Sequence, residues 1–579
     1  MRNRKGIAVL IISFFIFSNI LLINSGKTNN NLVLSDTSIR SIDSNTWTFL
    51  VYLDGDNNLE KYGLKAIKDM EFGFEGICEI SIIVLIDRHP KYDSSEGNWT
   101  GARIYKIRKN LTNNIDSELL LDLGEINVGN PDILEFFINF GFENYPAKNY
   151  LLTLWNHGGG SQGICYDYSE TDYNNRLTID ELRNAIEKSE FLFSERINII
   201  SLLGCNMGVI DVAYELHDLS DYLIFSQETG YSEAIDWTIL TKTICDYPLL
   251  NSYELVYEII RCYSLTDHNM RLPTTLSAIN LEEIPSVVNE ISNLANNLSN
   301  IINNGHIKSI TKALDNTLII DNIYVDIADF IKNLRKNETI SYLYPALNQS
   351  MIKLLTTIRK AVEFKYQNIN FHNNTCGLSI VFPYPRLLEY ETYFSSSVIM
   401  WYYEGLDWLE NCTWKYFLQE FYDDTDNDAL ADWFEVKYNL NSTSMDSNND
   451  GINDGNEDHD SDELTNYYEY QNGSNPYSND TDLDGLTDYQ EIMEFNSLPF
   501  KTDTDLDGYS DYEEVIAGTD PNDVQDYPNK KELNSINAIE IISVIIPFFV
   551  ILLSLVLILL FICKFARIKE IIIKKWNET

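Results

Sequence analysis

The feature that most constrains the fold is an acidic segment in the C-terminal part of the chain. Between Phe421 and Asp526, 30 residues are Asp or Glu and two are basic, which gives this segment a net charge of −28 out of −45 for all 579 residues. Carboxylates at this density repel one another and keep a chain extended unless cations neutralise them. The segment is therefore either a cation-binding unit or a solvated acidic linker.

The acidic residues follow one spacing, Asp-x-Asp-x-Asp-Gly-x-x-Asp-x-x-Glu, in five copies that start 22, 12, 22 and 23 residues apart. Calcium takes about six to eight oxygen ligands, and a loop of about twelve residues supplies them from positions 1, 3, 5, 9 and 12, with a tight turn at position 6. Two copies lack the glycine at position 6. The repetition favours structural calcium sites over a linker. The predicted ligands are Asp424, Asp426, Asp428, Asp432 and Glu435; Asp446, Asn448, Asp450, Asp454 and Glu457; Asp458, Asp460, Asp462, Asn466 and Glu469; Asp480, Asp482, Asp484, Asp488 and Glu491; and Asp503, Asp505, Asp507, Asp511 and Glu514.

The short period leaves too little chain for a long helix on both sides of each loop, and a turn such as Gly473-Ser474-Asn475-Pro476 closes a copy instead. A calcium sensor, which needs long flanking helices, is therefore disfavoured. Residues 423–526 resemble the thrombospondin type 3 repeats. This resemblance implies a small calcium-stiffened stalk between a working domain and the membrane.

Both ends of the chain are apolar. Residues 1–25 are predicted to be a signal peptide, because the basic residues Arg2, Arg4 and Lys5 are followed by an apolar run and then by small residues. The alternative is a membrane anchor that is not cleaved. Residues 541–563 carry no charge and are long enough to cross a bilayer. The basic residues of the tail, 564–579, predict that it stays in the cytoplasm. We expect a single-pass cell-membrane protein with an extracellular body.

Net charge, sequons and cysteines limit the kinds of partner and site that the protein can have. The strong negative charge excludes a nucleic-acid backbone, which needs a basic binding face. Ten Asn-x-Ser/Thr sequons before the predicted membrane segment agree with an exterior glycoprotein. The eight cysteines are too sparse for a disulfide scaffold, and they lack the spacing of a zinc site. Nothing in the sequence indicates an oligomeric state.

The first 400 residues alternate apolar runs of strand character with segments of helical spacing. This order predicts an α/β fold, with a mostly parallel sheet flanked by helices and a site at the carboxyl ends of its strands. Strands are expected at 47–53, 80–86, 150–155, 197–203 and 222–225, and helices at 59–72, 131–140, 178–189 and 209–219.

Two of these strand ends carry residues suited to nucleophilic catalysis. One strand runs into His157 and three glycines, and the next runs into Gly204 and Cys205. A thiolate is a strong nucleophile, and a nearby imidazole activates it. The amides of Gly158 and Cys205 are natural donors to an oxyanion. Taken alone, either residue could also be a core residue beside a packing turn.

The same residues lie in segments that resemble the clostripain family of cysteine peptidases, which has a caspase-like fold. The resemblance covers residues 46–410 and implies His157 as general base and acid, Cys205 as nucleophile and Gly158 as oxyanion partner. It implies protein or peptide substrates, and no cofactor for the chemistry itself. The matching segments are 51–60, 154–160, 204–216 and 226–229, with weaker similarity at 275–279, 325–330 and 377–383.

One position departs from the family pattern. The family usually has an Asp two residues before the nucleophile, where it helps to bind a basic P1 side chain, and this chain has Leu203. Either Glu228, Glu233 or Asp236 supplies a carboxylate instead, or the P1 pocket takes an apolar or small side chain. Both alternatives remain open.

Asp54, Asp56 and Asn57 follow the first strand and either hold calcium or, as we favour, cap the next helix. Together the observations predict a membrane-anchored extracellular cysteine endopeptidase on a calcium-repeat stalk. The competing interpretation is a catalytically silent surface protein used for adhesion or display. Leu203, in place of the usual Asp, favours this interpretation.

Overall fold

The computed structural model describes residues 45–528, except 77, 98, 169–174, 229, 231–234, 267–273, 321–322, 368–374, 385–405 and 525. The predicted signal peptide, membrane segment and basic tail lie outside the described residues. Within the described part of the chain, no helix is both long and apolar enough to cross a bilayer.

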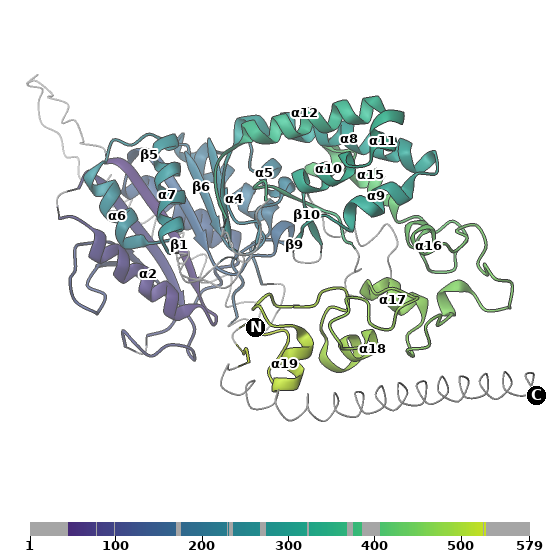
Figure 1. Cartoon of the computed structure of the whole chain (residues 1–579). Helices are drawn as coiled ribbons and strands as arrows, with labels where there is room; N and C mark the ends of the chain where they lie inside the picture. Colours follow the sequence, from purple (N-terminus) through teal and green to yellow (C-terminus); the bar gives the residue numbers. More distant parts are fainter. Residues whose placement is uncertain are drawn as a thin grey trace, which may run out of the picture. The chain divides into compact units, whose positions relative to one another are not determined.

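A nine-stranded sheet forms the centre of the domain, in the order β11-β8-β7-β6-β5-β1-β2-β3-β4 (Figure 1). The five predicted strands form its parallel core, and the other four pair antiparallel at the two edges. These edge strands are not among the predicted ones. The strands are β1 (Asn45–Gly55), β2 (Ile80–Arg88), β3 (Ala102–Lys106), β4 (Glu118–Gly124), β5 (Ala147–Trp155), β6 (Ile199–Leu203), β7 (Tyr222–Phe225), β8 (Thr275–Asn280) and β11 (Val362–Gln367).

Helices cover both faces of this sheet, as the alternation of strands and helices predicts. Along β1, Leu50 and Tyr52 point into one hydrophobic cluster, and Phe49, Val51 and Leu53 point into the other, because successive side chains of a strand alternate. One face carries α3 (Pro131–Asn144), α4 (Ile179–Phe193) and α5 (Ile210–Glu215). The other carries α2 (Glu60–Gly73), α6 (Trp237–Asp246) and α7 (Ser252–Thr266).

A second, helical layer extends the core beyond the large sheet. Its small sheet has the order β12-β10-β9, formed by Ser379–Val381, Tyr324–Asp326 and Ile319–Ile320. Phe382 at its end makes edge contacts with Trp414, Phe417 and Phe421. The helices are α8 (Ile284–Asn303), α9 (Ile307–Leu314), α10 (Ile327–Arg335), α11 (Glu338–Leu343), α12 (Pro345–Ala361), α14 (Trp408–Asn411) and α15 (Trp414–Phe421).

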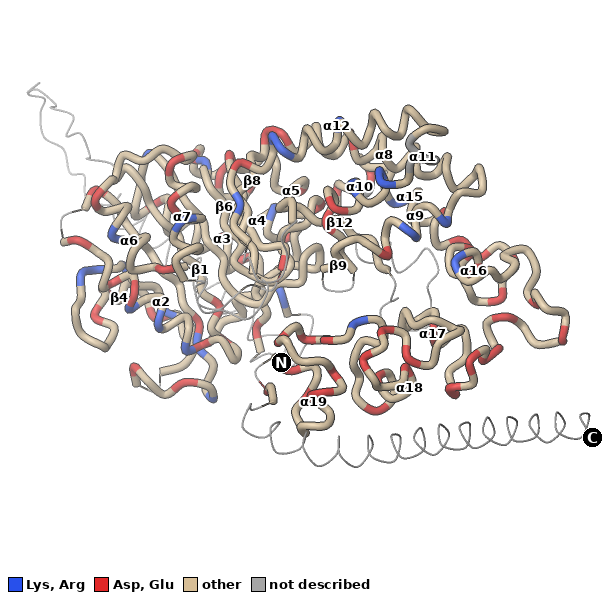
Figure 2. The backbone as a smooth tube through the Cα atoms, viewed as in Figure 1, with Lys and Arg blue, Asp and Glu red and all other residues tan. Residues whose placement is uncertain are grey.

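The acidic segment consists of loops, each followed by a single short helical turn or helix. Figure 2 shows acidic residues recurring along it. The helices are α16 (Asp432–Tyr438), η4 (Asp454–Asn456), α17 (Asn466–Asn472), α18 (Asp488–Gln490) with η5 (Glu491–Phe495), and α19 (Asp511–Ala517). Position 6 of every loop has a positive φ, including Ala429 at 80° and Glu463 at 82°, the two positions that lack glycine. The loop geometry therefore holds in all five copies.

Candidate active site

His157 and Cys205 lie side by side at one edge of the sheet. They follow the ends of β5 and β6, which are parallel neighbours in register, with Trp155 opposite Leu203. The Asn156 N–H donates to the Leu203 carbonyl at 3.4 Å and extends this pairing to the residue before His157. The two candidate catalytic residues therefore leave adjacent strands at the same level.

The glycines around them allow the two backbones to touch. A methyl group on Gly158 would lie 2.4 Å from the carbonyl oxygen of Cys205 and 2.9 Å from its amide nitrogen. A methyl group on Gly204 would lie 3.1 Å from the Gly158 Cα, and one on Gly230 would lie 3.1 Å from the Cys205 nitrogen. No side chain fits between these loops. The geometry therefore places the Gly158 and Cys205 amides together, as an oxyanion hole requires.

Two residues that the sequence analysis did not single out hold His157. The Oδ1 of Asn58 lies 2.8 Å from His157 Nε2, and the Tyr168 ring stacks on the imidazole with 6.0 Å between centroids. With the Asn58 oxygen as acceptor, Nε2 carries the proton and Nδ1 is the basic nitrogen. Burial lowers the pKa of His157 below its ordinary value. The imidazole is therefore neutral and able to accept a proton at neutral pH.

The sulfur of Cys205 is half-buried and receives a backbone hydrogen bond. The Gly230 N–H donates to Cys205 Sγ at 3.2 Å. The same sulfur lies 3.9 Å from the Gly230 carbonyl oxygen, to which the thiol can donate. By contrast, Cys165 is fully buried, and burial followed by the charge of Asp54 raises its pKa well above the ordinary value. The two cysteines nearest His157 in sequence thus differ in a way that favours Cys205 as the nucleophile.

A buried polar network supports the loop that contains the nucleophile. Gln227, just after β7, donates through Nε2 to Asp326 Oδ2 (3.2 Å) and Ser379 Oγ (2.8 Å), and its Oε1 accepts from the Gly377 N–H (2.7 Å). The Ser379 N–H then donates to the Gly208 carbonyl at 2.8 Å. Three segments that are distant in sequence, all part of the resemblance described above, thus meet behind Cys205.

The residues predicted for the substrate pocket differ in their surroundings. Leu203 is 6% exposed and packs in the hydrophobic cluster that contains Trp155 and Trp237. Glu228 is buried, and its carbonyl accepts from the amide of Asn206, the residue after the nucleophile. Asp236 caps α6 through the Ile239 N–H at 2.9 Å. Glu233 lies outside the described residues.

The repeat loops bring their predicted calcium ligands together. Carboxylate oxygens converge within 4.8 Å in several groups, including 424–426–428, 458–460–462 and 480–482–484, and Asp428 and Glu435 also converge with Asp454 of the next loop. Among the described residues, both carboxylate oxygens of Glu491 and of Glu514 are buried without a hydrogen-bond partner. Burial and the neighbouring aspartates raise the pKa of each of these glutamates to about 9. Buried, unpartnered oxygens of this kind suit a hard cation.

Some predicted ligands make other contacts. At position 9 of four loops, Asp432, Asp454, Asp488 and Asp511 accept hydrogen bonds from the backbone and hydroxyl of the residue at position 2. In the second loop, Glu457 accepts from Asn448 at 2.6 Å and lies 3.2 Å from His459 Nε2. Position 1 also accepts backbone N–H groups in the first and third loops. Positions 3 and 12 of the other loops keep a buried oxygen without a hydrogen-bond partner among the described residues, so they fit an ion best.

The structure also shows which residues lie at the N-terminus of α2. Its N-cap is Leu59, which makes no side-chain cap, so the expectation that Asp54 and Asp56 cap this helix is wrong. Asn57 accepts from the Leu59 N–H at 2.9 Å, while Asp54 and Asp56 are turned into the protein with no exposed surface. The chain bends at Asp56 and Asn57, directly after β1.

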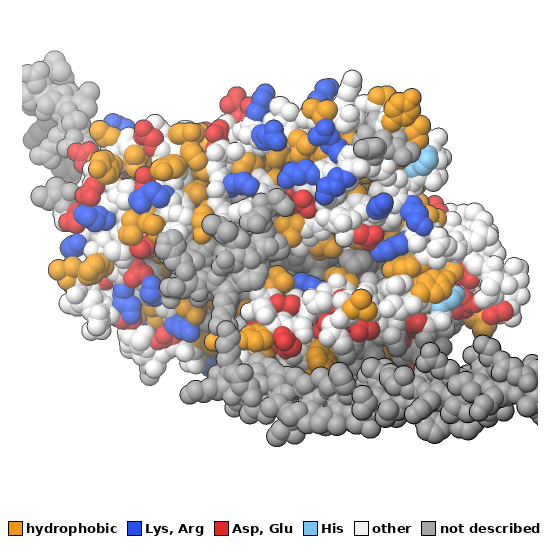
Figure 3. Space-filling model, in the orientation of Figure 1, with side chains coloured by type: hydrophobic (Ala, Val, Ile, Leu, Met, Phe, Trp, Pro, Cys, Tyr) orange, Lys and Arg blue, Asp and Glu red, His pale blue; other side chains and the backbone are white. Residues whose placement is uncertain are grey.

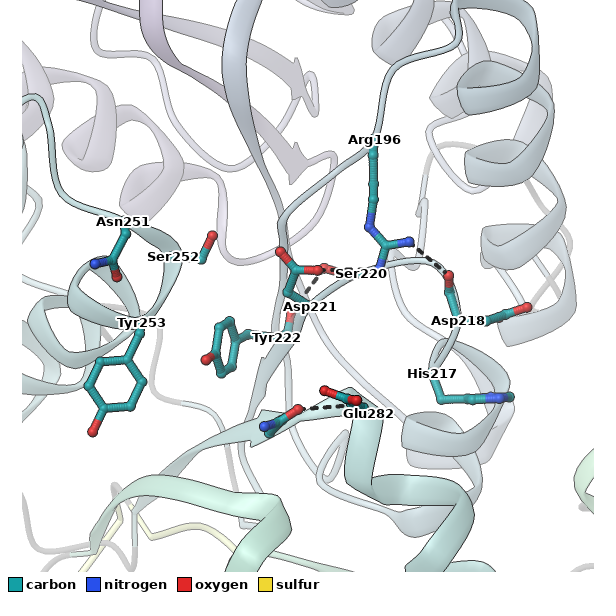
Figure 4. A pocket seen from close by; sticks show the side chains of 11 residues that line it. Arg196, His217, Asp218, Ser220, Asp221, Tyr222, Asn251, Ser252, Tyr253 and Glu282 are labelled. Atoms are coloured by element: carbon teal, nitrogen blue, oxygen red, sulfur yellow. Dashed lines mark hydrogen bonds and ion pairs between the residues drawn. The ribbon is translucent and has the colours of Figure 1, made fainter.

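A cavity elsewhere in the domain is separate from this site. It is lined by residues that include Arg196, Asp218, Tyr222 and Glu282 (Figure 4). Tyr222 begins β7, so the cavity lies at the amino end of that strand, whereas Cys205 follows the carboxyl end of the parallel β6. On the face shown in Figure 3, basic side chains are scattered among polar and hydrophobic ones.

Two family models match the chain. The clostripain family matches residues 51–433, and the bacterial TSP3 repeat matches residues 503–524. Clostripain from Hathewaya histolytica is 30% identical over 190 residues, which are 29% of this chain and 35% of that protein, so the chain spans about a third of this curated relative.

Two solved structures are also similar. One is a secreted C11 cysteine protease from Bacteroides thetaiotaomicron in complex with an irreversible peptide inhibitor (16% identity, 64% of this chain and 99% of that one, TM-score 0.46). The other is an inactive zymogen C11 protease from Parabacteroides distasonis (18% identity, 64% and 98%, TM-score 0.46). The family match covers most of the chain and includes both His157 and Cys205, and the protein therefore belongs to the clostripain family.

Proposed function

We propose that this protein is a cysteine-type endopeptidase that uses Cys205 and His157 as a catalytic pair. The observation that carries the proposal is the contact between the Gly158 loop and the Cys205 backbone, made by two adjacent parallel strands. It brings nucleophile, base and oxyanion donors to one place, which a chance pair of buried residues would not do. Family membership supports the same assignment.

In the proposed reaction, His157 Nδ1 takes the proton of the Cys205 thiol, and the thiolate attacks the peptide carbonyl. The Gly158 and Cys205 amides donate to the oxyanion of the tetrahedral intermediate. The imidazolium protonates the departing amine, which leaves an acyl-enzyme. His157 then removes a proton from water, which hydrolyses the thioester and restores the thiol.

The P1 preference depends on what replaces the usual pocket Asp. Leu203 offers no charge, and Asp236 already caps a helix, so Glu228 beside the nucleophile loop is the carboxylate best placed to meet a basic P1 side chain. Among the candidates that the structure describes, we propose Glu228 for this role. A pocket closed by Leu203 alone would take an apolar side chain instead.

The repeats are proposed to be a calcium-dependent stalk. The four glutamates at position 12 with no exposed surface, Glu435, Glu469, Glu491 and Glu514, would hold the ions together with the aspartates of positions 1, 3 and 5. Calcium there supplies charge neutralisation and rigidity and takes no part in peptide hydrolysis. The sequence pattern of the two chain ends supports attachment to the cell membrane with the body outside the cell.

The test is cleavage of a mixed peptide library by the full chain with calcium, read by mass spectrometry. Cys205→Ala should reduce cleavage by at least about 10⁴-fold. Cys78→Ala is the matched control, because Cys78 is also half-buried but precedes β2 at the opposite edge of the sheet. Equal cleavage by wild type and Cys205→Ala, or a folded wild type that cuts nothing, would refute the proposal. The second result would favour a catalytically silent surface protein.

A further inference from the structure

Two cysteines that the proposed reaction does not use lie side by side near the amino end of β2. Cys78 is half-buried in the loop between α2 and β2, and Cys245 lies near the end of α6 with 8% of its surface exposed. Cys245 belongs to the hydrophobic cluster on that face of the sheet, and Cys78 packs against this cluster. The Cys78 thiol donates a hydrogen bond to the Cys245 sulfur, so the two sulfur atoms are in direct contact.

Neighbouring contacts hold the two cysteines in this arrangement. Helices α2 and α6 lie side by side (Figure 1), and the Thr238 hydroxyl donates to a carbonyl group of α2 at 3.2 Å. Farther along α6, Lys242 Nζ lies 3.4 Å from Glu75 Oε1. Thr238, Lys242 and Cys245 are spaced four and three residues apart, so they lie on one face of α6. This face follows the chain from α2 past Glu75 to Cys78.

Other cysteines of the described chain have different surroundings. Cys376 Sγ donates to the Leu378 carbonyl at 3.2 Å, and the Ser292 hydroxyl donates to Cys412 Sγ at 3.5 Å. Cys165 lies in the hydrophobic cluster on the opposite face of the sheet. A bond between the two paired cysteines would therefore leave these contacts intact.

The contact between the two thiols favours ionisation of one of them. The hydrogen bond from Cys78 lowers the pKa of the Cys245 thiol, and the same hydrogen bond raises the pKa of the Cys78 thiol. Thiolates are the species that attack a disulfide sulfur. The pair therefore supplies one sulfur that ionises readily, next to a second sulfur with which it can bond.

We propose that Cys78 and Cys245 form a disulfide when the folded protein meets a small-molecule disulfide such as oxidised glutathione. One cysteine thiolate attacks a sulfur of the oxidant and releases one small thiol, and the second cysteine attacks the mixed disulfide and releases the other. Two protons and two electrons pass from the cysteines to the oxidant, which becomes two thiols. Because Cys78 lies outside the helices and strands, its loop can adjust as the sulfur atoms approach to about 2.05 Å.

The bond would close a loop of the chain that contains both catalytic residues. Residues 78–245 include His157 and Cys205, and a cross-link over so long a loop restricts the unfolded chain. Helix α6 also follows the segment that contains Gly230, whose N–H donates to Cys205 Sγ at 3.2 Å. The disulfide would therefore stabilise the framework of the active site without using the nucleophile. Formation of the bond does not rest on the proposed peptidase function.

The test uses the full chain, reduced, freed of reductant and then incubated in its folded state with oxidised glutathione. After acid quenching and alkylation, mass spectrometry should detect a linked pair of peptides containing Cys78 and Cys245, with at least tenfold less alkylation of both. Oxidation should also raise the melting temperature by at least about 2 °C. Cys78→Ala should lose both the link and this rise. Cys262→Ala is the matched control, because Cys262 lies in the same hydrophobic cluster and its replacement should leave both effects in place.

The possible results separate the disulfide from simple packing and from catalysis. Full alkylation of both cysteines after oxidation, a glutathione adduct on Cys78 without a link, or a link from Cys245 to Cys262 overturns the proposal. A link that forms only in denaturant overturns it as well. If Cys78→Ala does not fold, Cys78→Ser provides the same test. Cys205→Ala should form the link as wild type does, and a linked wild type that cuts no peptide would refute the peptidase function alone.

Discussion

Gly158→Ala tests whether the contact between the two catalytic loops matters for the reaction. The new methyl group would lie 2.4 Å from the Cys205 carbonyl oxygen and 2.9 Å from both its nitrogen and the Met207 sulfur, where ordinary contacts are 3.4–4 Å. The loops must therefore separate by about 1 Å, which is enough to move an amide out of the 2.7–3.1 Å range of an oxyanion donor. Loss of one such donor costs about 10²–10³ in kcat, or about 2.7–4 kcal/mol.

The assay is steady-state cleavage of the best library peptide, with thermal melting to check the fold. We expect kcat to fall by this factor with a much smaller change in KM, because the donor acts in the transition state. Gly76→Ala is the control, since a methyl group there meets no atom within 4 Å. A folded Gly158→Ala variant with the kcat of wild type would show that the Gly158 amide is not an oxyanion donor and that the loops tolerate separation.

Four further predictions follow from the same geometry. Asn58→Ala should lower kcat about tenfold to a hundredfold with little change in KM, measured by the same assay, because the imidazole of His157 loses its orienting acceptor. Since burial lowers the pKa of His157 below 6.5, the acid limb of a kcat/KM profile should lie below pH 6.5, and a limb above it would contradict the neutral base. Leu203→Asp should shift the cut sites toward Lys and Arg at P1, read from the peptide library. Without metal, burial raises the pKa of Glu491 from 4.5 to about 9, so the folded repeat holds a proton that the unfolded chain loses in this window. Metal-free stability should then fall between pH 5 and 9, whereas calcium-loaded stability should stay level in this window, because the carboxylate is ionised both beside the ion and in the unfolded chain; melting curves with chelator or calcium check both outcomes.

The parallel core could be predicted from the sequence because each of its strands is visible in a short local segment. Each central strand is a short apolar run, and His157 and Cys205 stand directly after two of them. Since carboxyl ends of parallel strands meet at one edge, their proximity followed once the strands were recognised. The edge strands were harder to see, because β4 is half-exposed and β11 pairs with β8 across more than 80 residues.

Other features depend on register and packing that no single segment reveals. In the sequence, Asp87 only marks the end of an apolar strand. Its pairing with Asp54 in the structure shows that two carboxylates meet in the core. The oxygen that contacts His157 Nε2 belongs to Asn58, about 100 residues earlier in the chain. Several polar residues lie in that segment, so the sequence does not indicate which of them makes the contact. Residues 411–422 lie between the two segments recognised by resemblance, and only the structure shows that Trp414, Phe417, Leu418 and Phe421 lie on one face of α15 and are buried.

For the proposed surface-anchored peptidase, the packing of α15 and α16 limits where the chain could be cut free. Phe382 is covered by α15, and Tyr384 packs on Trp433 of α16, with Lys437 bonded to Asp315. A cut between residues 410 and 438 would open this aromatic core and damage the enzyme. A cut that leaves this packing intact must therefore lie farther along the repeats. The freed domain would keep the first repeat loop, so if that loop binds calcium as proposed, the stability of the domain would depend on the calcium concentration of its new surroundings.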